Sequence, residues 1–372
     1  MKVFIASDNV YSPLGSTTEE NFKNMVDGKS SISLIEDSSI CRNPAYLSVF
    51  KEKISVFKNM TKFENIAVLS ISDALKKSNI DPEDSRILFI LSTTKGNIGI
   101  LDKSEKAVTD PARISLKSSA DVIARHFKFV NEPLIISNAC ISGVVSVIVA
   151  ERMIKNGLYD SIVVTGADVL SEFIVGGFQA LKATGSAPCK PFDAARDGIS
   201  LGECASTIVL TKDASKCSGK EKIECCNGAF NSDANHISGP SRTAEGLYLS
   251  ISRTLRDFGN SVDTISAHGT ATSFNDETEA IGFDRAGLNH VPLNSLKGYL
   301  GHTLGAAGVA EIAVSATSLK KGLFLRSFGY GTCGVSKNIN VAEKNIKGSF
   351  RTCLKTASGF GGCNASVLMI RN

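Results

Sequence analysis

The residue best suited to nucleophilic chemistry is Cys140, in the run SNACISG between a short apolar segment and a helical pattern. A thiol at a helix N-terminus lies near free backbone N–H groups and the positive end of the helix dipole. We expect this position to lower the thiol pKa from about 8.5 and to make the thiolate available as a nucleophile. The alternative interpretation is a small core residue, which is what most buried cysteines are.

Two of the five histidines lie beside glycines near the ends of predicted strands. His268 directly follows the predicted strand 264–267, and His302 lies in the glycine-rich run KGYLGHTLGAAG. In an α/β protein, binding and catalytic groups gather at the carboxyl ends of strands, and glycines let a substrate approach the backbone. Each of these histidines alone also fits a second role, which is to hold a loop in place. His126 and His290 fit structural or solvated positions.

A third glycine-rich run, SGFGGCN, places Phe360 between glycines just before the last predicted strand. Free backbone N–H groups there could bind an oxyanion, and the ring would be a bulky plug in a mobile loop. The run lacks the Lys-Ser/Thr of a phosphate-binding loop, and no GxGxxG follows the first predicted strand. An ordinary glycine-rich turn is the other interpretation.

These residues fall at the junctions of short apolar strands and longer helices, an alternation typical of an α/β protein with buried sheets. The predicted strands are Lys2–Ala6, Ile87–Ser92, Pro133–Ser137, Ser161–Thr165, Ala205–Thr211, Thr264–Ala267, Val291–Ser295 and Ala365–Ile370. The predicted helices are Thr18–Asp27, Lys62–Lys77, Ser118–Phe127, Gly143–Asn156, Ala244–Asp257, Asp276–Phe283 and Ala306–Lys320. Gly157 and Gly322 follow two of these helices and are predicted C′ residues.

Two of the strand–helix segments resemble each other. The run PLIISNAC and the run PLNSLKGYLGH each lead through small residues into a helix that contains Ala-Glu and closes in Lys-Asn-Gly or Lys-Lys-Gly. The similarity fits an internal duplication, although strand–helix units are common enough to match by chance. The polar stretch 212–224 is the best candidate for a boundary between the halves.

The composition narrows the classes of protein that the chain can be. It has 372 residues, of which 42% are hydrophobic and 21% charged, with a formal net charge of +4. Disordered and collagen-like proteins are excluded, no apolar run is long enough to cross a membrane, and the charge does not favour nucleic acid. Ten cysteines without a signal peptide or zinc-finger spacing predict reduced thiols in a cytoplasmic protein and no structural metal.

Taken in order, these pieces resemble the elongating β-ketoacyl-acyl carrier protein synthases of the thiolase superfamily. The Cys-His-His set formed by Cys140, His268 and His302 distinguishes this branch from initiating synthases, which use Cys-His-Asn, and from degradative thiolases, which use a second Cys. The other matching motifs, spread over nearly the whole chain, are YSPLG at 11–15, GKS at 28–30, PFD at 191–193, RDG at 196–198, LGE at 201–203, SDA at 232–234 and HGT at 268–270.

The resemblance implies a five-layered αβαβα thiolase-like fold made of two pseudo-repeated halves. Residues 1–212 would carry the nucleophile, and residues 213–372 would carry both histidines, the lysine and the Gly-Phe-Gly-Gly loop. It also implies a decarboxylative Claisen condensation of an acyl thioester on Cys140 with malonyl-acyl carrier protein, giving a 3-oxoacyl-acyl carrier protein for fatty-acid or specialised polyketide-like biosynthesis.

The same resemblance assigns roles to individual residues. His268 and His302 would hydrogen-bond the malonyl thioester oxygen, and the backbone N–H groups of Cys140 and Phe360 would bind the oxyanion of the acyl-enzyme. Phe360 would also gate the acyl pocket. The further expected site residues are Lys297 paired with Glu311, Thr270 and Thr272 on the phosphopantetheine arm, His236, Ile141 and Gly361.

The family resemblance also implies which partners and cofactors the protein uses. No metal or other cofactor is implied, because the phosphopantetheine is carried by the acyl carrier protein. That protein is acidic, so a basic docking face containing Lys58, Lys62 and Arg196 is expected. A homodimer is the expected assembly, and a heterodimer with a homologous subunit is the alternative assembly.

Two residues beside the nucleophile depart from the family pattern. Asn138 replaces the usual Thr, and Ile141 replaces a small residue and would reshape the acyl pocket. A non-catalytic partner similar to the chain-length factor of a ketosynthase is the main rival, but such proteins lose the nucleophile, whereas Cys140, His268, Lys297 and His302 are all present here. A thioesterase or acyltransferase is the second rival.

Overall fold

The computed structural model describes residues 1–54, 56–102, 105, 108–236, 239, 241–259 and 261–372. Ten strands are hydrogen-bonded in one continuous order, which divides into two five-stranded halves, called the first and second sheets below, that join through the register pair of Phe4 with Glu224. The first sheet contains β1 (Phe4–Tyr11), β4 (Ile87–Ser92), β5 (Leu134–Ile136), β6 (Ser161–Asp168) and β8 (Cys204–Thr211). The second contains β9 (Ile223–Ser232), β10 (Thr264–Ser266), β11 (Leu293–Asn294), β14 (Thr352–Gly359) and β15 (Cys363–Arg371).

The two sheets have the same topology. The strand orders are β5-β4-β6-β8-β1 and β11-β10-β14-β15-β9, so strands numbered one to five within each half lie in the order three, two, four, five, one. The first three strands in each order pair in parallel and the last two join antiparallel. This identity of order and direction confirms the internal duplication. The chain passes between the halves in the segment from β8 to β9.

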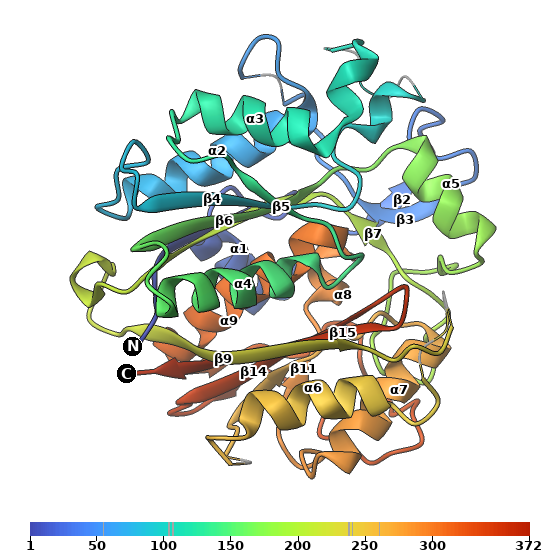
Figure 1. The fold of residues 1–372 in the computed structure, drawn as a ribbon. Helices are drawn as coiled ribbons and strands as arrows, with labels where there is room; N and C mark the ends of the chain where they lie inside the picture. Colours follow the sequence, from blue (N-terminus) through green and yellow to red (C-terminus); the bar gives the residue numbers. More distant parts are fainter. Residues whose placement is uncertain (55, 103–104, 106–107, 237–238, 240, 260) are drawn as a thin grey trace.

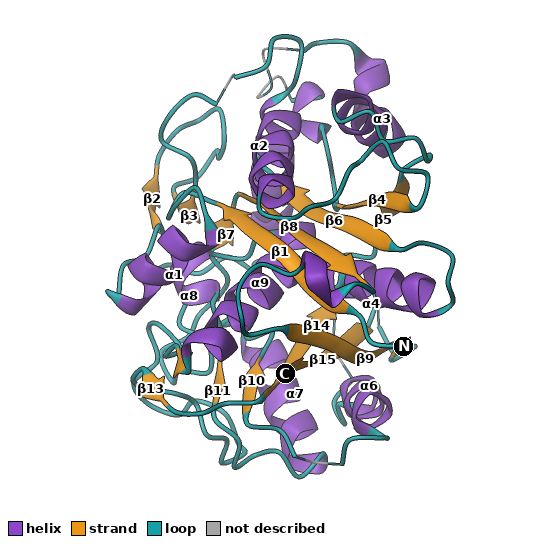
Figure 2. Cartoon of the chain, turned by 90° about the vertical axis from the view of Figure 1, so that its left-hand side faces the viewer, coloured by secondary structure: helices purple, strands orange, loops and turns teal. Residues whose placement is uncertain are grey.

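Helices complete five layers (Figures 1 and 2). α2 (Lys62–Lys76) and α3 (Leu116–His126) cover the outer face of the first sheet, and α6 (Glu245–Leu255) and α7 (Ser273–Arg285) cover that of the second. α4 (Ser142–Lys155) and α9 (Ala307–Lys321) lie between the sheets. The predicted αβαβα architecture is therefore confirmed.

Smaller elements lie around these layers. They are α1 (Thr18–Val26), α5 (Glu172–Ala180), α8 (Lys297–Leu300), the sheet of β2 (Ser33–Ile35), β3 (Ala45–Ser48) and β7 (Leu201–Gly202), and the pair β12 (Leu323–Phe324) and β13 (Ile346–Lys347). Short 3₁₀ turns occur at Ile98–Ile100, Pro111–Ile114, Ala214–Lys216 and Leu304–Ala306. None of the described helices is long and apolar enough to cross a membrane.

The sequence patterns explain where the main helices lie. α2 begins with a capping box, in which the Thr61 hydroxyl accepts from the Glu64 N–H and the Glu64 carboxylate accepts from the Thr61 N–H. It buries its apolar face against the first sheet. α9 has sheets on both sides and is buried over nearly its whole length, as expected for a helix without a polar face. Gly157 and Gly322 have positive φ angles of 72° and 58° after α4 and α9. Gly157 follows the C-cap Asn156 and is the predicted C′ residue, whereas Gly322 is itself the C-cap of α9.

The two central helices cross at a pair of glycines. A Cβ on Gly143 would lie 2.8 Å from the Val309 nitrogen, and one on Gly308 would lie 2.6 Å from the Val144 nitrogen. The contact is symmetric, which marks Gly143 and Gly308 as matching positions of the repeat. The Ala-Glu pairs that first indicated the repeat do not match, because Glu151 lies eight residues after its glycine and Glu311 only three.

Candidate active site

Cys140 lies in a strained turn between β5 and α4. Ala139 has a φ of 45°, which is uncommon for a residue with a side chain. Ser142 closes the turn, because its hydroxyl accepts from the Asn138 N–H at 2.7 Å and donates to the Ala139 carbonyl at 2.6 Å. The turn presents the Cys140 thiol to the cavity described below, so Asn138 contributes its backbone to the nucleophile turn.

The thiol of Cys140 is buried, and burial raises its pKa to about 11 even though the Lys297 charge opposes the shift. The expectation of a lowered pKa, which considered only the helix terminus, is therefore wrong for the resting protein: desolvation of the thiolate outweighs the favourable charges. The backbone N–H of Phe360 hydrogen-bonds the sulfur. A neutral resting thiol needs a neighbouring base before it can act as a nucleophile.

The backbone fixes the proton of His302. Its Nδ1 accepts the Leu304 N–H at 3.1 Å, so this nitrogen carries a lone pair. In a neutral imidazole the other nitrogen, Nε2, then carries the hydrogen. Burial, together with Lys297 and Lys355, holds the pKa of His302 well below its usual value, which keeps the ring neutral. Nε2 is buried and has no hydrogen-bond partner among the residues that the structure describes, so its N–H can donate to a ligand.

Two carboxylates of α7 hold the turn that carries His268. Glu279 accepts from the His268 N–H at 2.8 Å and the Gly269 N–H at 2.5 Å, and Asp276 accepts from the Thr270 N–H at 2.8 Å. Among the described residues, no hydrogen bond fixes the tautomer of the His268 ring. Burial and Lys297 keep its pKa well below the usual value, so it too is neutral.

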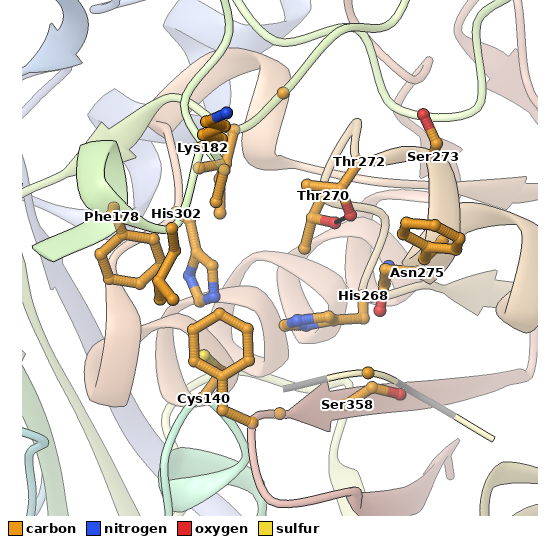
Figure 3. A pocket seen from close by; sticks show the side chains of 18 of the residues that line it. Cys140, Phe178, Lys182, His268, Thr270, Thr272, Ser273, Asn275, His302 and Ser358 are labelled. Atoms are coloured by element: carbon orange, nitrogen blue, oxygen red, sulfur yellow. Dashed lines mark hydrogen bonds between the residues drawn. The ribbon is translucent and has the colours of Figure 1, made fainter. Parts of the chain in front are cut away.

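The three predicted catalytic side chains converge. The Cys140 sulfur and one ring nitrogen each of His268 and His302 lie within 4.8 Å of one another, and the two rings meet edge to face with centroids 5.2 Å apart. Figure 3 shows both rings pointing into the cavity beside Cys140. The cavity has a volume of about 440 Å³ and is lined by residues of both halves. One reacting atom can therefore contact the thiol and both imidazoles.

Lys297 and Glu311 lie behind the histidines rather than in the cavity wall. Lys297 Nζ donates to the His268 carbonyl at 2.6 Å and to Glu311 at 2.7 Å, and both side chains are buried. The predicted pair is present. Charge from two nearby lysines holds the pKa of Glu311 below its usual value despite burial.

Phe360 stands at the entrance to the reacting atoms. Its ring stacks on Phe178 of α5 with centroids 5.8 Å apart, and its side chain is 41% exposed. Gly359 brings this segment against the nucleophile turn, since a Cβ there would lie 3.1 Å from the Cys140 nitrogen. The arrangement fits a ring that separates the wide part of the cavity from the thiol.

The expected substrate-binding residues are divided between wall and core. Thr270 and Thr272 line the cavity with their hydroxyl oxygens 2.8 Å apart, and His236 lines it near the entrance. Gly361 is exposed beside Phe360 and outside the lining. Ile141 is fully buried in the hydrophobic core with α4 and does not line this cavity.

Of the three residues expected in a docking face, two have internal partners. Lys62 Nζ contacts both carboxylate oxygens of the buried Glu203 at 2.7 Å. Arg196 donates to the backbone carbonyls of Asp193 and Gly334. Both charges stabilise the fold, whereas Lys58 is exposed.

The donor types of the three catalytic side chains also suit a soft divalent metal such as zinc. The hydrogen bond from Leu304 to His302 opposes that use, because it leaves a hydrogen rather than a lone pair on Nε2. The site is built to donate hydrogen bonds to an oxygen.

Sequence reasoning missed several residues that shape the site. They are Asp168, Phe178, Glu279 and Lys355. Asp168 is buried and accepts the Gly305 N–H at 2.7 Å and the Thr93 hydroxyl at 2.8 Å, which ties the His302 loop to the first half. A buried carboxylate that follows a strand of apolar residues is the one signal that could have indicated Asp168.

Comparison with known proteins agrees with this geometry. The relatives include the 3-oxoacyl-[acyl-carrier-protein] synthase 2 of Vibrio cholerae, 26% identical over 100% of this chain and 99% of that protein. They also include the tetracenomycin polyketide synthase ketoacyl synthase alpha subunit of Streptomyces glaucescens, 28% identical over 82% of this chain and 80% of that protein.

Solved structures share the fold. A β-ketoacyl synthase from Burkholderia phymatum matches with a TM-score of 0.87 and 23% identity, covering 100% of this chain and 99% of that one. A ketosynthase from Xenorhabdus doucetiae, solved in complex with its chain length factor, matches with a TM-score of 0.84 and 21% identity, covering 100% and 98%. Family models for the β-ketoacyl synthase N-terminal and C-terminal domains match residues 1–215 and 224–330. With its two-half thiolase-like fold and its converging thiol and imidazoles, this chain belongs to the β-ketoacyl synthase family.

Proposed function

We propose that the protein transfers an acyl group from acyl carrier protein to Cys140 and condenses it with malonyl-acyl carrier protein, releasing CO2 and a 3-oxoacyl-acyl carrier protein. The observation that carries the proposal is the convergence of the Cys140 sulfur with two neutral imidazoles within 4.8 Å in a cavity. The names of the relatives support the substrate class.

In the first step the Cys140 sulfur attacks the carbonyl carbon of the acyl thioester. The thiol proton passes to His268, whose tautomer is not fixed, and from there to the departing phosphopantetheine sulfur. The oxyanion of the intermediate would accept from the backbone N–H groups of Cys140 and Phe360. Phe360 already hydrogen-bonds the sulfur, so its N–H points to the reacting atoms.

In the second step the malonyl carboxylate leaves as CO2, and the two bonding electrons form an enolate on the thioester. The fixed Nε2–H of His302 donates to the enolate oxygen, with His268 as the second donor. The enolate carbon then attacks the acyl carbon on Cys140, the carbon–sulfur bond breaks, and the departing Cys140 thiolate takes up one proton from solvent, which replaces the proton that left with the phosphopantetheine thiol. Thr270 and Thr272 would hold the phosphopantetheine arm along the cavity.

The test is CO2 release from malonyl-acyl carrier protein. Each preorganised donor to a developing oxyanion is worth about 3–4 kcal/mol, or 10²–10³-fold in rate. His302→Ala and His268→Ala should each lower the decarboxylation rate by that factor, while Thr243→Ala, a change to an exposed side chain, should not. Undiminished CO2 release by both histidine variants would overturn the proposal.

A partner subunit similar to a chain-length factor is the second candidate, because the match from Xenorhabdus doucetiae is a ketosynthase solved with such a subunit. The same assay separates the two. A pure chain-length factor would release no CO2 alone and would take up no acyl group on Cys140.

Acyl carrier protein is the proposed partner, and Lys58 is the proposed docking residue. Lys58→Glu should raise the apparent KM for carrier protein several-fold in a salt-sensitive manner and leave kcat unchanged, because exposed charges steer association. Lys347→Glu, which changes an exposed lysine of β13, is the matched control. Lys62→Glu is unsuitable, since it would set a carboxylate against buried Glu203. An unchanged KM would remove Lys58 from the docking face.

We further propose a dimer formed through β5 and a cytoplasmic location. β5 lies at one end of the strand order, is apolar, and leaves Leu134 36% exposed. Edge strands of this kind pair readily with another chain. All ten cysteines are free thiols, which fits a reducing compartment. The same strand is available to a second copy or to a homologous subunit.

A further inference from the structure

Lys355 is a buried cation that the proposed chemistry does not use. It lies on β14 with an exposed fraction of 0%. Its Nζ donates to the Ala267 carbonyl at 3.0 Å and the Ser266 carbonyl at 3.2 Å, and it contacts Glu311 Oε2 at 2.8 Å. An ammonium group has three hydrogens, and here three buried oxygens surround it.

Lys355 and Lys297 share Glu311 between them. Lys297 contacts one carboxylate oxygen at 2.7 Å and Lys355 the other at 2.8 Å. Two ammonium groups therefore contact one carboxylate in the interior, and Glu279 is a second buried carboxyl group near enough to act on the charge of Lys355. A buried charge without its own counterion is costly, so the second lysine is not explained by stability alone.

The two lysines also bind three successive backbone carbonyls. Lys355 binds those of Ser266 and Ala267, and Lys297 binds that of His268 at 2.6 Å. These carbonyls lie at the carboxyl end of β10, where the strand stops and the His268 turn begins. Ser266 is the register partner of Lys355 in the parallel pair of β10 and β14. The lysine side chain therefore extends beyond the last residue of β10 to the carbonyl of Ala267.

We propose that Lys355 is a positioning residue of the reaction, which together with Lys297 clamps Glu311 and the carbonyls of residues 266–268 and thereby holds the His268 ring against Cys140. The role in catalysis rests on the proposed function. The clamp itself rests on the contacts given above.

The clamp has an electrostatic consequence for His268. Its ring faces Lys297 from α8, Lys355 from β14, and His302 and Cys140 across the cavity, while Glu279 of α7 binds its backbone. The positive charges of both lysines lower the pKa of the ring. Without Lys355, His268 should take up a proton at higher pH. An imidazolium cannot accept the Cys140 proton, so the acid limb of the rate should move to higher pH.

The experiment uses the full chain with Lys355→Met, which keeps the length of the side chain and removes the charge. The five histidines are labelled with ¹³C and titrated by NMR, with His268→Gln to assign the signal. We expect the His268 midpoint to rise by about one pH unit, a tenfold change in proton affinity. The acid limb of acyl transfer to Cys140 should move to higher pH by the same amount as the His268 midpoint, through kcat rather than KM, because this step needs His268 as the proton acceptor.

Lys155→Met is the matched control. Lys155 also pairs with a buried glutamate and donates to a carbonyl, that of Cys226, but at the far end of α4. Lys155→Met should leave the His268 titration and the pH profile of the reaction unchanged. If Lys355→Met does not fold, Lys355→Gln, whose amide can still donate hydrogen bonds but carries no charge, is titrated instead.

An unshifted His268 midpoint with an unchanged pH profile would overturn the inference. If Lys355→Met shifts the His268 midpoint but the wild-type protein releases no CO2, the clamp is supported and the proposed function is rejected. The two failures are therefore distinguishable.

Discussion

At the scale of single residues, the site works through proton positions that the fold sets. The Leu304 N–H determines which nitrogen of His302 carries hydrogen, and burial keeps the Cys140 thiol protonated at rest. The resting thiol therefore needs a neighbouring base to become a nucleophile, and a protonated thiol is less open to side reactions than a free thiolate.

The raised pKa of Cys140 predicts its alkylation behaviour. Because the thiolate fraction grows tenfold per pH unit below the pKa, the rate of iodoacetamide labelling should rise about tenfold per unit between pH 7 and 9 without a plateau. The rate is measured by mass spectrometry of the Cys140 peptide in a Cys333→Ser background, which removes the exposed thiol. A plateau below pH 8.5 would restore the lowered pKa expected from the sequence.

Residue types and order were enough to predict the catalytic set but not its protonation. Local sequence indicated Cys140, His268 and His302, because glycines or strand ends adjoin them in the chain, whereas Lys297 was expected only through the family resemblance. Burial and long-range contacts decide pKa and tautomer. Lys355, which meets Glu311 from 44 positions away, has no local signal.

At the scale of elements, the position of Cys140 depends on how closely α4 approaches α9. A Cβ on Gly308 would lie 2.6 Å from the backbone of α4, so α4 must move to accept it. Gly308→Ala should lower the free energy of unfolding by about 1–3 kcal/mol, the usual cost of overpacking. It should also reduce decarboxylation in the fraction that folds.

Gly176→Ala in α5 is the control for that substitution. A Cβ on Gly176 would meet nothing within 4 Å, and Ala in a helix is about 0.5–1 kcal/mol more favourable than Gly. Urea unfolding should therefore show destabilisation for Gly308→Ala and slight stabilisation for Gly176→Ala. Equal stability of the two variants would contradict the close crossing.

Elements with strong periodicity were predicted well and those with weak patterns were missed. β4 has the predicted bounds, and α2 differs by one residue at its end. α5, with the sequence EFIVGGFQA, was not predicted because its two glycines disfavour a helix. β9 and β14 were missed because polar residues interrupt their apolar runs; those within β14, Lys355 and Thr356, are buried in the structure, whereas Asn227 and Asn231 of β9 are half-buried.

At the scale of the whole molecule, assembly should depend on β5. Leu134→Lys places a charge on the exposed side chain of this edge strand, and charges on edge strands oppose pairing. Analytical ultracentrifugation should show a shift from dimer to monomer, with the melting temperature of the monomeric fold retained. Leu158→Lys, at another exposed leucine, is the control. A dimer that survives Leu134→Lys would place the interface elsewhere.

The two-half design was visible in the sequence only as a weak similarity between two segments. The Ala-Glu pairs that indicated it are not equivalent, and the matching strand orders are a property of pairings between strands far apart in the chain. Sequence reasoning reached the fold through the resemblance of ordered motifs rather than through the repeat.

The symmetric crossing of α4 and α9 has a consequence for how the two halves share the chemistry. Gly143 and Gly308 are matching positions, so Cys140 matches Gly305, and His302 matches Ser137. Each half therefore contributes a different reactive group to the cavity, and a substitution at one of these positions alters one side of the site while its counterpart stays unchanged.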